Sequence, residues 1–321
     1  MKILHIPISL SGIWEPARLH FENLLTIENH MQGINNYIFG SAESDLEHLL
    51  KNKKFDIINF HGWPLFNKST KYLETVKLAL LSKAKVVFSM FTYQIFCQNG
   101  LLKDNEVECD VFSCKNRLCQ NAIANFNFVK NFDILVYSNA AKDIFTNWGF
   151  SKVHKAPMCF YSHTDSFIKP SFNPHSQFKL ALLYPGAPFY EDEDIMNQVF
   201  DKNKDIIYLK IKNIYNNYDS NYSFSSYSWK TSFPFEIGYS LSKGIIPIYF
   251  SQYDINDYEG VQNIYRINKN DLLGSIERIV LTETSEKNRN DMAYNFWLNN
   301  GPEYCMVRMQ TIYDSLISNP S

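Results

Sequence analysis

Residues 229–250 read WKTSFPFEIGYSLSKGIIPIYF, and they carry the clearest pattern in the chain of a helix followed directly by a strand. Pro234 suits the first turn of a helix, where its missing N–H group costs nothing. Gly244 is the residue type that most often ends a helix. The apolar run 245–250 follows at once and predicts a buried strand, so the helix is expected to pack tightly on a sheet.

The start of this predicted helix is also a candidate anion site. Lys230, Thr231 and Ser232 supply one cation, two hydroxyl groups and nearby backbone N–H groups. Such groups at a helix N-terminus suit a phosphate, and a nucleoside diphosphate would fit there. The alternative is that Ser232 merely caps the helix.

The chain before this stretch alternates between predicted strands and helices, which favours a parallel sheet with helices on both faces. The expected strands of the first half are residues 2–9, 35–40, 55–62, 85–91, 132–138 and 152–158. The expected helices are residues 16–26, 44–52, 70–84 and 139–149, the last closed by Gly149.

A second alternation begins at residue 178. It contains predicted strands at 178–186, 206–212 and 245–250, helices at 192–200, 232–244 and 271–281, a polar loop at 216–228 and a mostly helical tail from 286. The polar, proline-containing segment 166–177 is interpreted as a linker. We therefore predict an α/β protein with two Rossmann-like lobes facing across a cleft. Their bounds are 1–168 and 177–300, with a crossover helix at 301–321.

Composition narrows the classes of function. The chain has 321 residues, 45% hydrophobic and 20% charged, which is typical of a globular protein. Its formal net charge of −2 provides no global positive field for nucleic acid, so that partner is not expected. Lysine-bearing helices within 49–54 and 70–85 offer a modest basic face for a membrane surface, or simply a solvated helix surface.

The N-terminus and the cysteines carry further expectations. MKILHIPISL is a short apolar run interrupted by Pro7, so we expect a buried strand there and no signal peptide. We expect a cytoplasmic protein, with a peripheral place at the inner face of the membrane as the alternative. Cys97, Cys109, Cys114 and Cys119 form a cluster with the spacing C-x11-C-x4-C-x4-C. Zinc binding is one interpretation, but the spacing is unlike CxxC, so we favour free thiols.

Several segments, in order along the chain, resemble family-4 glycosyltransferases and their relatives of GT-B fold. The segment 229–250 is similar to the donor-lobe signature of that family, with Pro234 and Gly244 in register and Pro247 one residue late. Residues 55–63 (FDIINFHGW) resemble the family's strand that ends in His. Residues 135–149 resemble the segment in which a Ser, here Ser138, follows a strand and caps a helix.

The resemblance implies a role for each matched residue. Gly12 would lie in the glycine loop near the donor phosphates, and Gly186 at the tip of the strand that opens the donor lobe. His61 would lie at the cleft as the catalytic candidate, with Trp63, Phe91 and Tyr93 on the acceptor side. The expected donor-binding residues are Gly12, Gly186, Lys212, Lys230, Thr231, Ser232, Glu236 and Tyr239.

The chain also departs from the family pattern. The family usually carries two Glu residues in this helix region, and Thr231 and Tyr239 occupy those positions. Glu236 stands where one variant of the signature has Lys. Ala187 follows Gly186 where the family usually has Arg, and Phe91 replaces a common His. Lys230, Lys210 and Lys212 are the remaining candidates for neutralising a departing diphosphate.

These features lead to three hypotheses of function. The first is a retaining, metal-independent hexosyltransferase that uses a UDP- or GDP-sugar, no cofactor, and a glycan or lipid-linked acceptor in surface polysaccharide synthesis. The second is a pseudo-glycosyltransferase that stabilises another glycosyltransferase as its partner. The third is another two-lobed α/β protein, such as an epimerase of GT-B fold.

Overall fold

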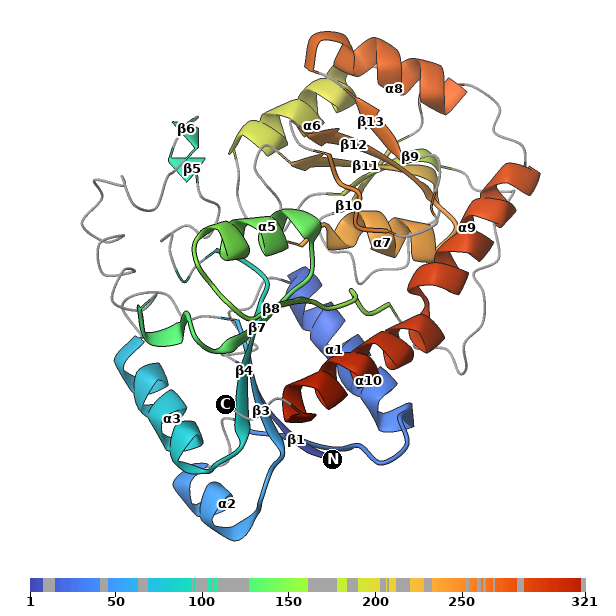
Figure 1. Ribbon diagram of the computed structural model, residues 1–321. Coiled ribbons are helices and arrows are strands. Elements are labelled where there is room, and N and C mark those ends of the chain that lie inside the picture. Colours follow the sequence, from blue (N-terminus) through green and yellow to red (C-terminus); the bar gives the residue numbers. More distant parts are fainter. Residues whose placement is uncertain are drawn as a thin grey trace.

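Two parallel β-sheets covered by helices form the two lobes of the chain (Figure 1). The computed structural model describes residues 1–7, 15–40, 46–62, 69–93, 95, 103–104, 107–108, 127–160, 178–183, 190–202, 206, 208–211, 220–227, 233–251, 254–258, 261, 264–267, 269–281 and 286–318.

The first sheet has the strand order β2-β1-β3-β4-β7-β8, and every neighbouring pair is parallel. Its strands are β1 (Lys2–Pro7), β2 (Asn35–Ile38), β3 (Ile57–His61), β4 (Lys85–Met90), β7 (Asp133–Val136) and β8 (Val153–Lys155). The order reverses between β1 and β3, where Pro7 pairs with His61. In an open α/β sheet such a reversal leaves a crevice at the carboxyl ends of the strands, which is where ligands bind.

The second sheet repeats this arrangement. Its order is β10-β9-β11-β12-β13, again parallel throughout, so its reversal lies between β9 and β11. The strands are β9 (Phe178–Leu183), β10 (Tyr208–Ile211), β11 (Ser220–Tyr227), β12 (Ile246–Ser251) and β13 (Tyr265–Ile267). Taken in chain order, the second sheet therefore follows the pattern 2-1-3-4-5, and the first sheet follows the same pattern with a sixth strand added at its end.

Helices cover the first sheet as the alternation predicts. They are α1 (Glu15–His30), α2 (Leu46–Asn52), α3 (Ser69–Leu81) and α5 (Asn139–Asn147). The expected helix at 16–26 is therefore a turn longer at its end. Ser138 caps α5 as expected, since its side chain accepts a hydrogen bond from the backbone N–H of Ala141. A short antiparallel pair, β5 (Lys103–Asp104) and β6 (Val107–Glu108), lies between β4 and β7 in the sequence.

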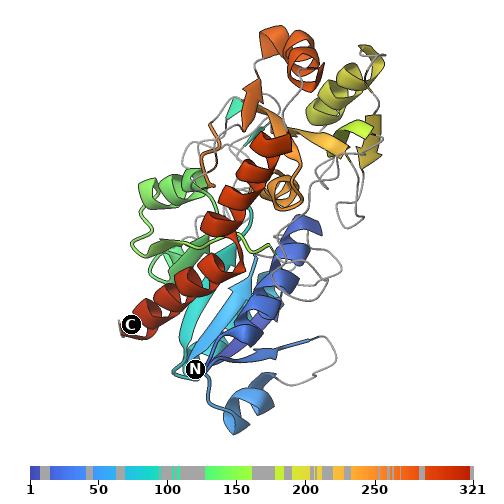
Figure 2. The ribbon, with the colours of Figure 1, turned by 90° about the vertical axis from the view of Figure 1, so that its right-hand side faces the viewer.

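The helices after β9 cover the second sheet and return to the first. They are α6 (Tyr190–Lys202), α7 (Phe235–Ser242), η3 (Lys269–Asp271), α8 (Leu272–Leu281), α9 (Glu286–Asn300) and α10 (Pro302–Ser318). Helix α9 contacts α7, whereas α10 contacts α1 of the first lobe. Figures 1 and 2 show this pair running along one side of both lobes. None of the helices described is long and apolar enough to cross a membrane.

The structure corrects two expectations about the second lobe. Residues 216–228 were expected to be a polar loop, but β11 occupies 220–227 and is the central strand of the sheet. Its serines are buried because they find partners, as the Ser223 hydroxyl does by donating to Ser240 Oγ of α7 at 2.7 Å. Helix α7 begins at Phe235, so Pro234 occupies the N-cap position rather than the expected first turn, and it makes no side-chain cap hydrogen bond.

A polar clamp also joins the lobes next to α5. Asp257, in the segment after β12, accepts a hydrogen bond from the backbone N–H of Asn139 at 2.6 Å. Lys155 of β8 pairs with the same carboxylate at 3.2 Å. A carboxylate at a helix N-terminus is favoured by the helix dipole. The clamp therefore fixes the second lobe to the start of a helix in the first.

The expected linker, 166–177, lies outside the described residues, so the domain bounds stay a prediction.

Gly238 of α7 sets how closely this helix approaches the connection between the lobes. A Cβ atom there would lie 2.3 Å from Phe160 Cζ and 2.6 Å from Tyr258 Cε1. In an open helix Gly→Ala stabilises by about 1 kcal/mol. We expect Gly238→Ala instead to lower the free energy of unfolding by roughly 1–3 kcal/mol through overpacking. Urea denaturation would measure it.

Gly40→Ala is the matched control, because a Cβ atom at Gly40 would meet no atom within 4 Å. Equal stabilities of the two variants would contradict the packing account.

Candidate active site

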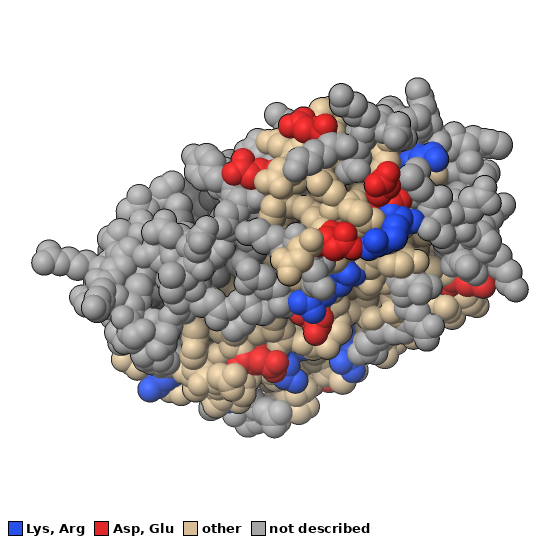
Figure 3. Space-filling model, turned by 90° about the horizontal axis from the view of Figure 1, so that it is seen from above, with Lys and Arg blue, Asp and Glu red and all other residues tan. Residues whose placement is uncertain are grey.

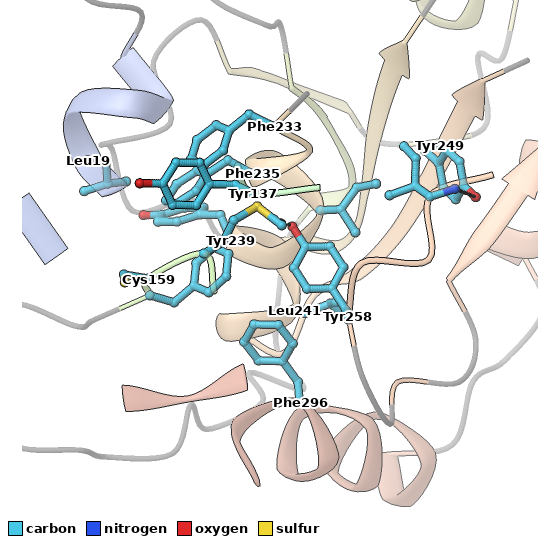
Figure 4. Packing of buried hydrophobic residues seen from close by; sticks show 14 of the residues in the cluster. Leu19, Tyr137, Cys159, Phe233, Phe235, Tyr239, Leu241, Tyr249, Tyr258 and Phe296 are labelled. Atoms are coloured by element: carbon cyan, nitrogen blue, oxygen red, sulfur yellow. Dashed lines mark hydrogen bonds between the residues drawn. The ribbon is translucent and has the colours of Figure 1, made fainter. Parts of the chain in front are cut away.

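The carboxyl ends of the two sheets meet in a seam of aromatic side chains. From the first lobe come His20 of α1, Phe91 just after β4 and Tyr137 just after β7, and all three are buried. Phe233 and Phe235, at the start of α7, come from the second lobe. We call these five residues the aromatic seam. Figure 4 shows Tyr137, Phe233 and Phe235 side by side, next to Leu19 of α1.

Ring geometry shows how closely the seam is packed. The Phe233 ring meets those of Phe91, Tyr137 and His20 edge to face, with centroids 5.3, 5.5 and 5.3 Å apart. Phe91 and Tyr137 stack in parallel at 5.0 Å. Edge-to-face and offset-stacked pairs of this kind are the favoured aromatic geometries. The seam therefore holds the lobes together at the place where an open α/β sheet binds its ligand.

His61, the expected catalytic residue, ends β3 at the reversal point of the first sheet. Its ring lies against Phe21 and Phe91, with centroids 4.5 and 6.4 Å away. Burial lowers the pKa of His61 well below 6.5, helped by the neighbouring His5 and His20. The ring is therefore neutral at pH 7. Nδ1 has no hydrogen-bond partner among the described residues.

Phe91 and Tyr93, both expected on the acceptor side, lie in different places. Phe91 belongs to the aromatic seam. Tyr93 is fully buried in the other core cluster of the first lobe, with its ring 6.2 Å from that of Phe145 of α5. Burial raises the pKa of Tyr93 above its usual value, with a smaller contribution from Asp257. Both residues follow β4, as the sequence predicts, but only the side chain of Phe91 lies in the aromatic seam.

Glu236 and Tyr239, both expected to bind the donor, lie on α7 and are buried. Glu236 Oε2 accepts a hydrogen bond from the Tyr227 hydroxyl at 2.9 Å, at the end of β11. Glu236 Oε1 has no partner among the residues described here. The Tyr239 ring stacks against Phe235, and the Lys243 amine lies 5.4 Å from its centroid.

The other expected site residues lie outside the described residues. They are Gly12, Trp63, Gly186, Lys212, Lys230, Thr231 and Ser232, together with Cys97, Cys109, Cys114 and Cys119 of the zinc hypothesis. Four of the described strands nevertheless end where these segments begin: β1 at Pro7, β3 at His61, β9 at Leu183 and β11 at Tyr227. These four ends flank the two reversal points.

Sequence reasoning missed His20, Phe233 and Phe235. The sequence around His20 does not indicate a site residue. The pattern of a helix shows which face is apolar, but not which residues that face contacts after folding. The Phe-Pro-Phe run before α7 was a usable signal, since two aromatic residues around a helix start have to be buried somewhere.

The cavity between the lobes near the polar clamp is small. It measures about 30 Å³ and its lining includes Lys155, Asp257, Tyr258 and Arg308. That is room for a few water molecules. Within the described ranges no group of three or more His, Cys, Asp or Glu side chains could hold a metal ion.

The outer face of the second lobe carries charges of both signs. In Figure 3 acidic and basic side chains are interspersed over the described part of that face. Some are paired, as Arg278 is with Asp271 and Arg266 with Asp254. Mixed charge of this kind keeps a surface solvated and does not by itself mark a binding site.

Comparison with known proteins shows the fold. Neither a family model nor a curated protein sequence matches this chain. Among solved structures, a glycosyltransferase from Rickettsia africae is similar over 99% of both chains, at 12% identity and a TM-score of 0.61. The Anabaena protein HepE in complex with UDP-glucose is similar over 99% of this chain and 98% of that chain, at 10% identity and a TM-score of 0.54.

A third similar structure is the catalytic domain of starch synthase IV from Arabidopsis thaliana bound to ADP and acarbose. It matches over 99% of this chain and 98% of that chain, at 10% identity and a TM-score of 0.55. The predicted fold, two Rossmann-like lobes in the GT-B arrangement, is confirmed by these matches and by the two parallel sheets. The narrower resemblance to family 4 stays a prediction.

The pKa of Glu236 generates a test of its environment. Burial raises that pKa from 4.5 to about 7, although hydrogen bonds with Tyr227 and its own backbone lower it. Between pH 4.5 and pH 7 the carboxyl group of Glu236 is therefore protonated in the folded state and ionised in the unfolded chain. The free energy of unfolding falls as pH rises through this range. Glu236→Gln removes this loss, and we expect the variant to gain roughly 2–3 kcal/mol over wild type between pH 4 and pH 8.

Chemical denaturation at a series of pH values would measure the difference. The control is Glu303→Gln, an exposed glutamate in the first turn of α10. Parallel stability profiles for wild type and Glu236→Gln would show that the carboxyl group is not held in its protonated form.

Proposed function

We propose that this protein is a glycosyltransferase that moves a hexosyl group from a nucleotide sugar, a UDP- or GDP-sugar, to a glycan or lipid-linked acceptor. Surface polysaccharide synthesis is the proposed setting, at or near the cytoplasmic face of the membrane. The proposal includes a retaining course without a metal ion, since a departing phosphate can itself take the proton of the acceptor hydroxyl.

One observation carries the proposal: the two sheets share the strand order 2-1-3-4-5, and their reversal points meet at one seam. Each reversal point is a place for a ligand, and transfer between two substrates needs two such places close together. The similar Anabaena structure contains UDP-glucose and the similar Arabidopsis structure contains ADP and acarbose. A nucleotide sugar therefore suits the second lobe, and the acceptor suits the first.

The second lobe supports donor binding through its chain order. The segments that follow β9 and β11 contain Gly186, Lys230, Thr231 and Ser232, and Lys212 follows β10. The departing diphosphate gains negative charge, which cations and a helix N-terminus stabilise. We propose that Lys230 and Ser232 contact the diphosphate, with Lys212 as a further cation. His61 is the proposed catalytic residue in the first lobe.

A second candidate function rests on the start of α7. Phe233 and Phe235 fill the seam against the first lobe, and Tyr239 stands where the family has a ribose-binding Glu. A pseudo-glycosyltransferase that stabilises a partner enzyme would keep such a seam closed. When purified alone, it would not turn over a nucleotide sugar. It would also co-purify with a second glycosyltransferase.

A thermal-shift series with UDP, GDP and ADP tests the main proposal. A nucleoside diphosphate at a hundredfold excess over its Kd stabilises the folded state by about 3 kcal/mol, which raises Tm by several degrees. We expect UDP or GDP to do so, and Lys230→Ala and Ser232→Ala to abolish most of the shift because each removes a diphosphate contact.

Lys179→Ala is the matched control, an exposed lysine of the same lobe at the opposite end of β9. No stabilisation of wild type by any of the three nucleotides would count against the proposal. An unchanged shift in both variants would refute the assignment of Lys230 and Ser232.

A further inference from the structure

Lysine side chains gather at one edge of the first sheet, the edge at which its strands begin. One lysine lies at the start of β1, and others come just before β3, β4, β7 and β8 begin. Because neighbouring strands of this sheet are all parallel, their starts lie along the same edge. These lysines, here called the basic edge, are exposed or half-buried: Lys2, Lys53, Lys54, Lys83, Lys130 and Lys152.

No lysine of the basic edge forms an ion pair with a described residue. Asp133, at the start of β7, pairs instead with Lys85 and His154. Asp56 Oδ2 accepts a hydrogen bond from the backbone N–H of Lys2 at 2.7 Å. The edge therefore keeps a positive charge in a chain whose formal net charge is −2, and this asymmetry gives one face of the protein a positive field.

Two exposed leucines adjoin the basic edge. Leu80 and Leu81 are 39% and 79% exposed, and Leu81 is the last residue of α3, in the chain that leads into β4. An apolar side chain gains free energy when it leaves water for the boundary between lipid headgroups and acyl chains. The end of α3 therefore offers an apolar tip among the lysines.

Lys83 follows this tip in a backbone conformation that favours glycine. Its φ is 64°, and no other non-glycine residue of the described ranges has a positive φ. Glycine would relieve the strain of that conformation, so the lysine side chain is a candidate for a role of its own.

The basic edge faces away from the aromatic seam. The strands of a parallel sheet run from their starting edge to their carboxyl ends, and a strand of the length of β1 separates the two by ~20 Å. Figure 1 shows α2 and the N-terminus at the end of the first lobe that lies away from the second lobe. Docking through the basic edge would therefore leave the candidate active site uncovered.

The chemistry of the edge favours a membrane over other anionic partners. The described arginine of the first lobe, Arg18, lies in the first turn of α1 and so at the opposite edge. Arginine is the cation typical of nucleic-acid and protein interfaces, and lysine is depleted at protein interfaces. Lysine carries a compact, hydrated charge that is attracted to the diffuse negative potential of anionic lipids.

We propose that the basic edge docks this protein on an anionic membrane surface, with Leu81 inserted among the lipid headgroups. The sequence predicts a modest basic face within 49–54 and 70–85, and the structure extends it across the sheet through Lys2, Lys130 and Lys152. Docking agrees with the membrane setting of the proposed function but needs neither a nucleotide nor an acceptor, so it is tested separately from sugar transfer.

Flotation of the full-length protein with lipid vesicles tests the docking. We expect the protein to float with vesicles of equimolar phosphatidylcholine and phosphatidylglycerol, and to stay unbound with phosphatidylcholine alone. Molar salt should release it, because salt screens the attraction between exposed lysines and lipid. Failure to float with the anionic vesicles at low salt would overturn the proposal.

A triple variant locates the docking surface. Each lysine near an anionic surface strengthens binding about fivefold, so the combination of Lys54→Gln, Lys83→Gln and Lys152→Gln should weaken vesicle binding about a hundredfold. All three side chains are exposed or half-buried, so we expect the Tm of wild type.

The matched control combines Lys142→Gln, Lys179→Gln and Arg308→Gln, which removes the same charge from exposed positions outside the basic edge. We expect it to bind vesicles within about twofold of wild type, since charges beyond a Debye length of the membrane are screened. Equal losses in the two triple variants would show a diffuse attraction and would refute the assignment of the edge.

Leu81→Gln separates a membrane from other anionic partners, because only a membrane takes up an apolar side chain there. We expect this variant to bind the anionic vesicles about tenfold more weakly. Poly(U) RNA serves as the competing probe. If Leu81→Gln binds vesicles as tightly as wild type does, and poly(U) binds wild type but not the triple edge variant, the membrane assignment is wrong and a nucleic acid is the partner.

Discussion

Helix α7 packs between the two lobes, and its burial sets how closely they approach each other. All eight of its residues are buried, and its start carries the two phenylalanines of the aromatic seam. Gly238 lets the connection between the lobes, at Phe160, come against the middle of the helix. Interiors packed at this density do not deform gradually. The lobes therefore either stay in register around α7 or move apart as units.

The seam combines an apolar surface with a few polar atoms that lack partners. His20 Nε2 and His61 Nδ1 lie on the first-lobe side, and Glu236 Oε1 lies on α7 of the second lobe. Each such atom costs free energy as long as it lacks a partner. An apolar site with a small number of placed polar groups is also what a small-molecule ligand needs. The proposed binding of a ligand between the lobes would give these atoms partners.

The fold was largely readable from the sequence because its strands are apolar runs with clear ends. His61 was predictable for the same reason, as a polar residue that closes the buried run 57–61 at a sheet edge. The central strand β11 was not predictable from the sequence, because its serines are typical of a loop. A serine is buried at low cost only when it has a partner, and Ser240, the partner of Ser223, is 17 residues away. His20 was hidden similarly, since its neighbours come from both lobes.

The C-terminal helices add a connection that neither lobe contains by itself. Helix α9 contacts α7, next to the seam, while α10 contacts α1 and supplies the Tyr313 hydroxyl to Glu28. The same carboxyl group lies against His5, which is bonded to His61 at the reversal point of the first sheet. A displacement of α10 would therefore leave a buried carboxyl oxygen without its donor, at a cost comparable to that of a lost charged hydrogen bond. Because that cost falls on residues that hold His61, the seating of the last helix and the state of the candidate active site are energetically coupled.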